Sequence, residues 1–235
     1  MKNEEFTKII KHHKSHFWYR FRKGIVREFI SKLGIRRKPV LDIGCGTGVD
    51  MHENTNALGA DIDFNALKNN PYKERVNCRI ESLPFKEHSF NAVLTMDVLQ
   101  HESVDIPCAV RSVYNVLKPG GYWLINVPAM PSLYSYHDIA VGNGMRFSRN
   151  QLEKDTSGLF AVYFKSHWNM IMLPGVMIAR IIRTALSSQH PSDLKTMLPL
   201  TDKILFNILR IEHYFFRKQQ IPAGLSIFYI LRRIN

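Results

Sequence analysis

The chain has 235 residues, of which 45% are hydrophobic and 22% are charged. This length and composition suit one globular domain with appendages, and they exclude a disordered chain, a collagen-like fibre and a disulfide-stapled miniprotein. The formal net charge of +12 indicates a partner that is an anionic substrate, a membrane surface or a nucleic acid.

The charge is distributed unevenly along the chain. Residues 1–38 carry a net charge of +9, residues 39–164 a net charge of −4, and residues 165–235 a net charge of +7. We interpret the centre as a catalytic core and the basic flanks as the parts that meet the substrate. The alternative is that both flanks are solvated helix faces.

The first segment, residues 5–33, has the pattern of one or two amphipathic helices rich in basic and aromatic residues. No apolar leader precedes it, so we expect no signal peptide. Cys45, Cys78 and Cys108 form no C-x-x-C pair, which favours a reducing compartment and a cytoplasmic protein. The histidines do not have the spacing of a metal-ligand set, so we expect no metal; those considered are His12, His13, His16 and His101.

The central part alternates short apolar runs with helical patterns. The second helical pattern ends at Lys118-Pro119-Gly120-Gly121, which is a strong stop and turn signal. This alternation predicts a parallel sheet with helices on both faces. The expected strands are residues 39–43, 58–62, 90–95 and 121–127, and the expected helices are residues 64–70 and 106–117.

Two further strands are expected at residues 161–168 and 225–232. The pattern between them, over residues 170–219, is helical, apolar and basic, and it is too long for a simple connection. Its longest apolar run, residues 168–179, is too short to span a bilayer. We divide the chain into a helical lid (1–38), an α/β core (39–169), a helical insert over an acceptor pocket (170–219) and a final core strand (220–235).

The most informative stretch is Leu41-Asp42-Ile43-Gly44-Cys45-Gly46-Thr47-Gly48. A buried strand runs into a turn with glycine at every second position, which permits tight turning and close approach of a ligand to the backbone. A second acid, Asp61, stands at the end of the next expected strand, where a carboxylate can accept hydrogen bonds from both ribose hydroxyls.

With these features the sequence resembles class I S-adenosylmethionine (SAM) dependent methyltransferases. Residues 41–48 and 59–63 are similar to the first two motifs of that family, and four later stretches follow in order up to residue 127. They are Glu81-Ser82-Leu83-Pro84-Phe85, Ser89-Phe90-Asn91-Ala92-Val93, Val98-Leu99-Gln100-His101 and Val116-Leu117-Lys118-Pro119-Gly120-Gly121. The resemblance implies a Rossmann-like seven-stranded sheet whose last strand is antiparallel.

The resemblance also implies roles for single residues. Gly44, Cys45 and Gly46 would pass under the methionine part of SAM, Asp42 would orient that loop, and Asp61 would hold the ribose. The remaining contacts would be Ile62 against adenine, Ser82 and Leu83 at the adenine edge, and Thr95, Met96 and Leu99 beside the sulfonium.

The flanks resemble a narrower group of these enzymes. Tyr19 and Arg22 lie in an aromatic and basic helix that would close over the SAM carboxylate; the alternative is a helix that only packs on the sheet. His137 and Asp138 are candidates for acceptor contact or for a general base, and His101 is the rival base. A structural role as a helix cap or a loop residue is the alternative for both His137 and Asp138.

The resulting hypothesis is a methyltransferase that moves a methyl group from SAM to an oxygen or nitrogen of a small-molecule, sugar or lipid-type acceptor. A nucleic-acid (RNA) methyltransferase and a non-catalytic SAM-binding protein are the alternatives. The basic flanks favour an anionic or lipid-like acceptor and peripheral contact with a membrane, while nucleic acid is less favoured. The sequence leaves open the acceptor, the use of a base and whether the chain dimerises.

Overall fold

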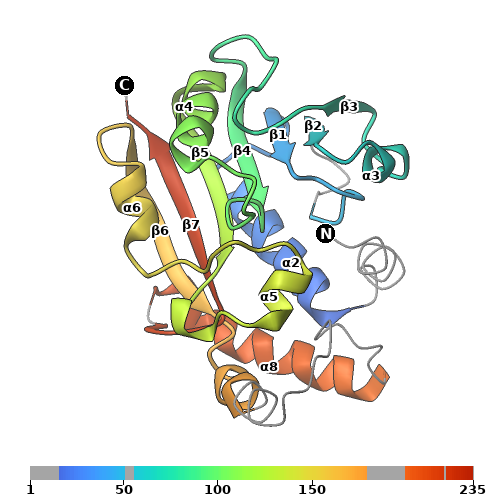
Figure 1. Ribbon diagram of the computed structural model, residues 1–235, viewed down its shortest axis with the longest axis vertical. Helices are drawn as coiled ribbons and strands as arrows, with labels where there is room; N and C mark the ends of the chain where they lie inside the picture. The colour runs from blue at the N-terminus through green and yellow to red at the C-terminus, as the bar shows by residue number, and fades with distance from the viewer. Residues whose placement is uncertain (1–15, 51–55, 179–198, 220, 235) are drawn as a thin grey trace.

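The computed structural model describes residues 16–50, 56–178, 199–219 and 221–234. Its centre is one seven-stranded sheet in the order β3-β2-β1-β4-β5-β7-β6 (Figure 1). The strands are β1 (Pro39–Ile43), β2 (Asn56–Asp61), β3 (Glu74–Asn77), β4 (Phe90–Met96), β5 (Leu117–Pro128), β6 (Phe160–Trp168) and β7 (Ser226–Arg233).

The strand directions divide the sheet into two parts. β3, β2, β1, β4 and β5 run parallel to their neighbours, whereas β7 is antiparallel to both β5 and β6. The expected Rossmann-like sheet with an antiparallel last strand is therefore confirmed. β7 is buried at seven of its eight positions because it lies between two other strands, and its run Ile227 to Leu231 is accordingly apolar throughout.

One face of the sheet is covered by α2 (Phe17–Lys32) and α8 (Pro199–Arg217). Phe17, Phe21, Ile25 and Phe29 recur every four residues on α2 and are all buried, which is the pattern of a helix that packs one stripe on a sheet. Trp18, on the same helix, stacks on Trp168 at the end of β6, with 4.4 Å between the ring centroids. These contacts hold α2 against the sheet, next to the end of β6.

The other face carries α4 (Ile106–Val116) and α6 (Gln151–Asp155), which pack on β4 and β5; Figure 1 shows α4 in front of these strands and α2 behind them. α4 begins where the side chain of Asp105 accepts a hydrogen bond from the backbone N–H of Cys108. That cap satisfies one of the free N–H groups of the first turn. Helices therefore cover both faces, as the alternating pattern predicts.

Three elements differ from the expected ones. β3 has no counterpart among the expected strands: it is four residues long, polar and largely exposed at the sheet edge, so no apolar alternation marks it. β5 begins at Leu117 instead of Gly121, because Leu117 pairs with Phe90 before a register shift in β4. The third is the short helix α5 (Tyr136–Ala140) in the loop after β5.

Parts of the expected lid and insert lie outside the described residues. These are residues 1–15, which include His12 and His13, and residues 179–198. The segment between Gly48 and Asp61 is described up to residue 50 and from residue 56. The described residues contain α3 (Phe64–Lys68) after β2, and none of their helices has the length and hydropathy needed to cross a membrane.

Candidate functional site

A pocket of about 470 Å³ lies at the carboxyl ends of β1, β2 and β4, the edge where open α/β sheets bind ligands. This volume is in the usual range for small-molecule sites. Its walls come from the loop after β1, the residues after β2 and β4, and α2. Of the residues that the sequence singles out, nine line it: Tyr19, Arg22, Gly44, Cys45, Gly46, Asp61, Ile62, Met96 and His101.

The glycine loop after β1 brings bare backbone to the pocket. Gly44 has a φ of +68°, and a Cβ at this position would lie 2.3 Å from Cγ2 of Val98. Gly46 has a φ of +49°, and a Cβ there would meet no atom within 4 Å. Gly44 is therefore required for packing, whereas Gly46 presents its backbone to open space beside the pocket.

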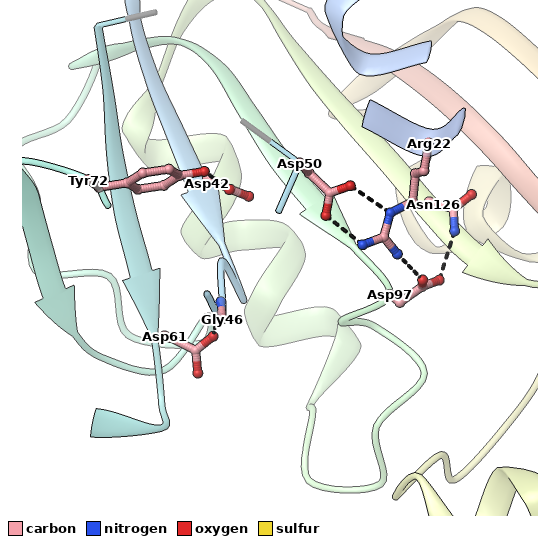
Figure 2. A network of polar contacts seen from close by, with 8 residues as sticks. All are labelled: Arg22, Asp42, Gly46, Asp50, Asp61, Tyr72, Asp97 and Asn126. Carbon is pink, nitrogen blue, oxygen red and sulfur yellow. Dashed lines mark hydrogen bonds and ion pairs between the residues drawn. The ribbon is translucent and has the colours of Figure 1, made fainter. Parts of the chain in front are cut away.

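Asp61, at the end of β2, faces the glycine loop. Its Oδ2 accepts a hydrogen bond from the backbone N–H of Gly46 at 2.7 Å (Figure 2). Its Oδ1 accepts one from the N–H of Asp63 at 2.8 Å. Burial raises the pKa of Asp61 above its ordinary value, although these N–H donors oppose that effect. A carboxylate has about four acceptor positions, so Asp61 retains capacity for hydroxyl groups of a ligand.

Arg22 of α2 enters the pocket between two carboxylates. Its Nε and Nη2 donate to Oδ1 and Oδ2 of Asp50, at 2.7 and 2.5 Å, and its Nη1 donates to Oδ2 of Asp97. Burial works to lower the pKa of Arg22, but Asp50 and Asp97 outweigh it and keep the guanidinium charged. Figure 2 shows the three side chains converging from α2, the loop after β1 and the end of β4.

The network continues from Asp97 into the sheet. Asn126 on β5 donates to Oδ1 of Asp97 at 2.7 Å, and the indole N–H of Trp168 donates to Oδ1 of Asn126 at 2.8 Å. Desolvation raises the pKa of Asp97, and Arg22 and Asn126 work against it. This chain of contacts links the lid helix to the ends of β4, β5 and β6. Asp50 and Asp97 carry no sequence signal, because neither has a recognisable spacing to Arg22.

Asp42, expected to orient the glycine loop, lies beneath the pocket instead of in its lining. The hydroxyl of Tyr72 donates to its Oδ2, as Figure 2 shows. Burial, reinforced by the nearby carboxylate of Asp50, raises the pKa of Asp42 to about 7. Asp42 is therefore placed to support the loop from within the fold, and its expected role in orienting that loop remains a prediction.

Four other expected contacts also lie outside the lining. Thr95 is fully buried and accepts a hydrogen bond from the indole N–H of Trp123, and Leu99 is 1% exposed in the core. The N–H of Leu83 donates to Oγ of Ser112. The segment that lines the pocket is Arg79 to Glu81, directly before Ser82, and Arg79 and Glu81 form an ion pair at 3.2 Å. The adenine contacts of Ser82 and Leu83 remain a prediction.

His101 stands on the pocket rim, and its orientation is determined by one backbone contact. Its Nδ1 lies 3.0 Å from the carbonyl oxygen of Gly142, which also lines the pocket. A carbonyl oxygen can only accept, so this contact places the proton on Nδ1 and leaves the lone pair of the neutral ring on Nε2. His101 therefore has the tautomer that a general base requires.

His137 and Asp138, on α5, lie outside the pocket lining. Asp138 is fully buried, and its Oδ1 forms an ion pair with Nε of Arg146 at 2.9 Å. Its Oδ2 accepts from the N–H of Ser135 to close the capping box of α5. Asp138 thus has the partners that its structural reading implies. His101 lines the described pocket and His137 does not, and the role of either histidine as a base remains a prediction.

The seven-stranded sheet with its antiparallel β7 matches the Rossmann-like fold of methyltransferases. Residues 41–125 match the sequence model of a family described as "Methyltransferase domain". This match lies in the central part of the chain, over strands β1 to β5.

Three relatives are similar in sequence to part of this chain. An uncharacterized protein of Methanocaldococcus jannaschii is 34% identical over 53% of this chain and 50% of its own length. Probable tRNA methyltransferase 9B of Mus musculus is 32% identical over 45% of this chain and 25% of its own, and demethylmenaquinone methyltransferase of Symbiobacterium thermophilum is 28% identical over 42% and 46%. The chain spans half or less of these relatives.

Solved structures share the fold over most of the chain. The protein YcgJ of Bacillus subtilis has a TM-score of 0.60 at 18% identity and covers 92% of this chain and 99% of its own. A geranyl diphosphate methyltransferase in complex with SAM has a TM-score of 0.54 at 14% identity, over 90% of this chain and 84% of its own. At these identities the likeness establishes the fold.

Proposed function

We propose that this protein is a cytoplasmic methyltransferase that binds SAM in the described pocket and methylates an oxygen or nitrogen of a small-molecule, sugar or lipid-type acceptor. The observation that carries the proposal is the convergence of three elements on one pocket. The glycine loop, Asp61 at the end of β2 and Arg22 of the lid helix all line it, and they supply open backbone, an acceptor carboxylate and a fixed cation.

The residues present fit SAM. Gly46 leaves room for close approach of a ligand to the backbone, Asp61 has free acceptor positions for ribose hydroxyls, and Ile62, 60% exposed, offers an apolar surface for a purine. Tyr19 and Arg22 face the same space from α2, with the guanidinium 5.3 Å from the tyrosine ring centroid. An arginine beside an aromatic ring is suited to a carboxylate held away from water.

SAM, when bound, supplies the methyl group of its sulfonium to the attacking acceptor. The leaving group is S-adenosylhomocysteine. The contribution of the chain is to align the acceptor and to exclude water. For a hydroxyl acceptor, Nε2 of His101 accepts the proton as the new bond to carbon forms. Its tautomer is already set by the Gly142 carbonyl.

The acceptor class is argued from the surroundings of the pocket. Of the relatives described above, one is named a probable tRNA methyltransferase and another a demethylmenaquinone methyltransferase, so their names do not agree on an acceptor. We favour a small or lipid-type acceptor because the described core between the flanks is acidic overall, whereas a phosphate backbone requires a continuous cationic surface. An RNA acceptor and a non-catalytic SAM-binding role are the alternatives.

Titration calorimetry tests the cofactor. We expect SAM and S-adenosylhomocysteine to bind with micromolar affinity, about −8 kcal/mol, and Asp61→Ala to weaken binding by about 1–3 kcal/mol because the ribose hydroxyls lose a charged acceptor. Asp155→Ala, an exposed carboxylate of α6, is the matched control. Unchanged affinity in a folded Asp61→Ala protein would remove Asp61 from the site.

Methyl-labelled SAM tests the acceptor. The protein is incubated with lipid, small-molecule and RNA fractions of a cell extract, and transfer of label is measured in each. Label in the lipid or small-molecule fraction supports the proposal. Label in RNA alone supports the first alternative, and SAM binding without transfer to any fraction supports the second.

A further inference from the structure

The face of α8 that points away from the sheet is apolar and has no partner in the described part of the chain. Buried Leu209 and Phe216 face the core, whereas five apolar residues spaced by three and four form one stripe on the other side. The stripe is Leu200 (70% exposed), Ile204 (51%), Ile208 (partly exposed), Ile211 (65%) and Phe215 (48%).

A second apolar segment lies beside this stripe. The N–H of Ile171 donates to Oε2 of Glu212 on α8 at 3.0 Å, and Met172 packs in the same core cluster as α8. Ile171 (47% exposed), Met177 (38%) and Ile178 (58%) are again open to water. Figure 1 shows this short orange segment next to α8 at one end of the molecule. Together with the stripe they form an extended apolar surface. Single exposed apolar side chains are common on soluble proteins, but an extended apolar surface marks an interaction site.

The charges around the stripe have one sign. Lys203 and Arg210 lie seven residues apart along one edge of it, and both are exposed. Arg217, seven residues further on, is exposed as well but pairs with Glu28 of α2 at 2.8 Å. The two acids of α8 are turned away: Asp202 accepts hydrogen bonds from Phe17 and Arg20 of α2, and Glu212 is 3% exposed. The open face of α8 therefore combines aliphatic side chains with cations and presents no carboxylate.

We propose that this surface, the α8 stripe with residues 170–178, rests on an anionic lipid membrane. A helix with an apolar face bordered by Lys and Arg lies in the headgroup plane with its aliphatic side chains among the acyl chains and its cations against lipid phosphates. RNA offers phosphates but no acyl layer for Ile204 and Ile211. A two-fold dimer through the stripe would bring the cation rows of two copies together, which opposes self-association.

The surface is independent of methyl transfer, because neither α8 nor residues 170–178 line the cofactor pocket. A failure of vesicle binding can consequently be told apart from a failure of SAM binding, so the two proposals are tested independently. α8 nevertheless contacts the lid helix through Asp202, whose Oδ1 accepts from the N–H of Phe17 at 2.5 Å. A membrane below α8 would thus lie next to the helix that carries Tyr19 and Arg22.

Co-sedimentation with vesicles tests the proposal. The full chain is mixed with vesicles of equal parts phosphatidylcholine and phosphatidylglycerol, and separately with phosphatidylcholine alone. We expect binding to the anionic vesicles, a loss of about tenfold or more in Ile204→Glu/Ile211→Glu, and a loss of about fivefold per cation in Lys203→Gln/Arg210→Gln. Ile234→Glu, 43% exposed after the far end of β7, is the control and should bind like the wild type.

The two isoleucines are exposed, so both variants should melt like the wild type, and equal melting temperatures confirm that folding is intact. Absence of wild-type binding would overturn the proposal, and so would equal binding by wild type and Ile204→Glu/Ile211→Glu. A wild-type dimer in light scattering that the same substitutions convert to a monomer, without vesicle binding, would assign the surface to a second copy instead.

Discussion

Arg22 and Asp50 are 28 residues apart in the chain, and they form a two-point ion pair that joins α2 to the loop after β1. The side chains of both residues are at least nine-tenths buried. Two parallel N–H···O contacts fix the orientation of the guanidinium as well as its position. The lid helix is therefore held at the pocket by charge as well as by the packing of its aromatic stripe.

Removing this guanidinium should destabilise the protein strongly. Arg22→Met leaves Asp50 and Asp97 without their cation, and we expect a loss of about 3–5 kcal/mol in the free energy of unfolding. The double variant Arg22→Met/Asp50→Asn should lose less than the sum of the single variants, because one stranded charge is gone. Denaturant titration measures all of these proteins. Lys32→Met removes an exposed partner of Glu28 on the same helix and should cost less than about 1 kcal/mol. Additive losses at Arg22 and Asp50 would contradict the coupling.

Asp42 should give the protein an unusual dependence of stability on pH. Its carboxyl has a pKa of about 7 in the folded protein and about 3.9 when unfolded, so only the folded state holds this proton between those values. Stability from this group is present below about pH 4 and is lost as pH rises through about 7. Asp42→Asn keeps the contact with Tyr72 and carries no charge.

Thermal melts at several pH values measure this effect. The Asp42→Asn variant should unfold like the wild type near pH 4, and near pH 8 it should be more stable by roughly 4 kcal/mol. The relevant quantity is the difference between the two proteins, since other groups titrate equally in both. Parallel curves for the two proteins across this range would show that Asp42 titrates normally.

The buried pair of Asp138 and Arg146 predicts a structural effect without a specific catalytic one. Asp138→Ala strands Arg146 in the core and opens the capping box of α5, so we expect a loss of about 3 kcal/mol and a fall of about 6–12 °C in Tm. Asp155→Ala, on the exposed side of α6, should change stability by about 0.5 kcal/mol at most. If Asp138→Ala melts like the wild type and yet loses turnover, Asp138 belongs to the acceptor site after all.

His101 should carry the proton transfer, and His137 should not. On the proposed function, His101→Ala lowers kcat by about tenfold or more for a hydroxyl acceptor and leaves SAM affinity unchanged, because Nε2 acts on the acceptor alone. His137→Ala serves as the matched control and should retain kcat. The reverse result would return the base to His137, and full activity in both variants would mean that alignment of the reactants suffices.

The local signals in the sequence account for most of the fold. β1, with its apolar run into alternating glycines, and α4, with its Asp cap and proline in the first turn, lie where the pattern predicts them to within a residue. Asp61 follows from its place after the second strand. These features can be predicted from the sequence because each is determined by residues that are close together in the chain. β3 was not predicted, because it is a short polar edge strand without an alternating apolar pattern. Its position is determined by pairing with β2.

What the sequence by itself determined is therefore the sheet, the glycine loop and the class of cofactor that such a loop suits. Only the tertiary structure decided which polar side chains meet. It brought Asp50 and Asp97 to Arg22, took Asp138 into an ion pair with Arg146, and placed His101 on the pocket rim. The physical reason is that charges gain most from partners that burial brings together, and those partners come from different elements at separations that no local pattern records.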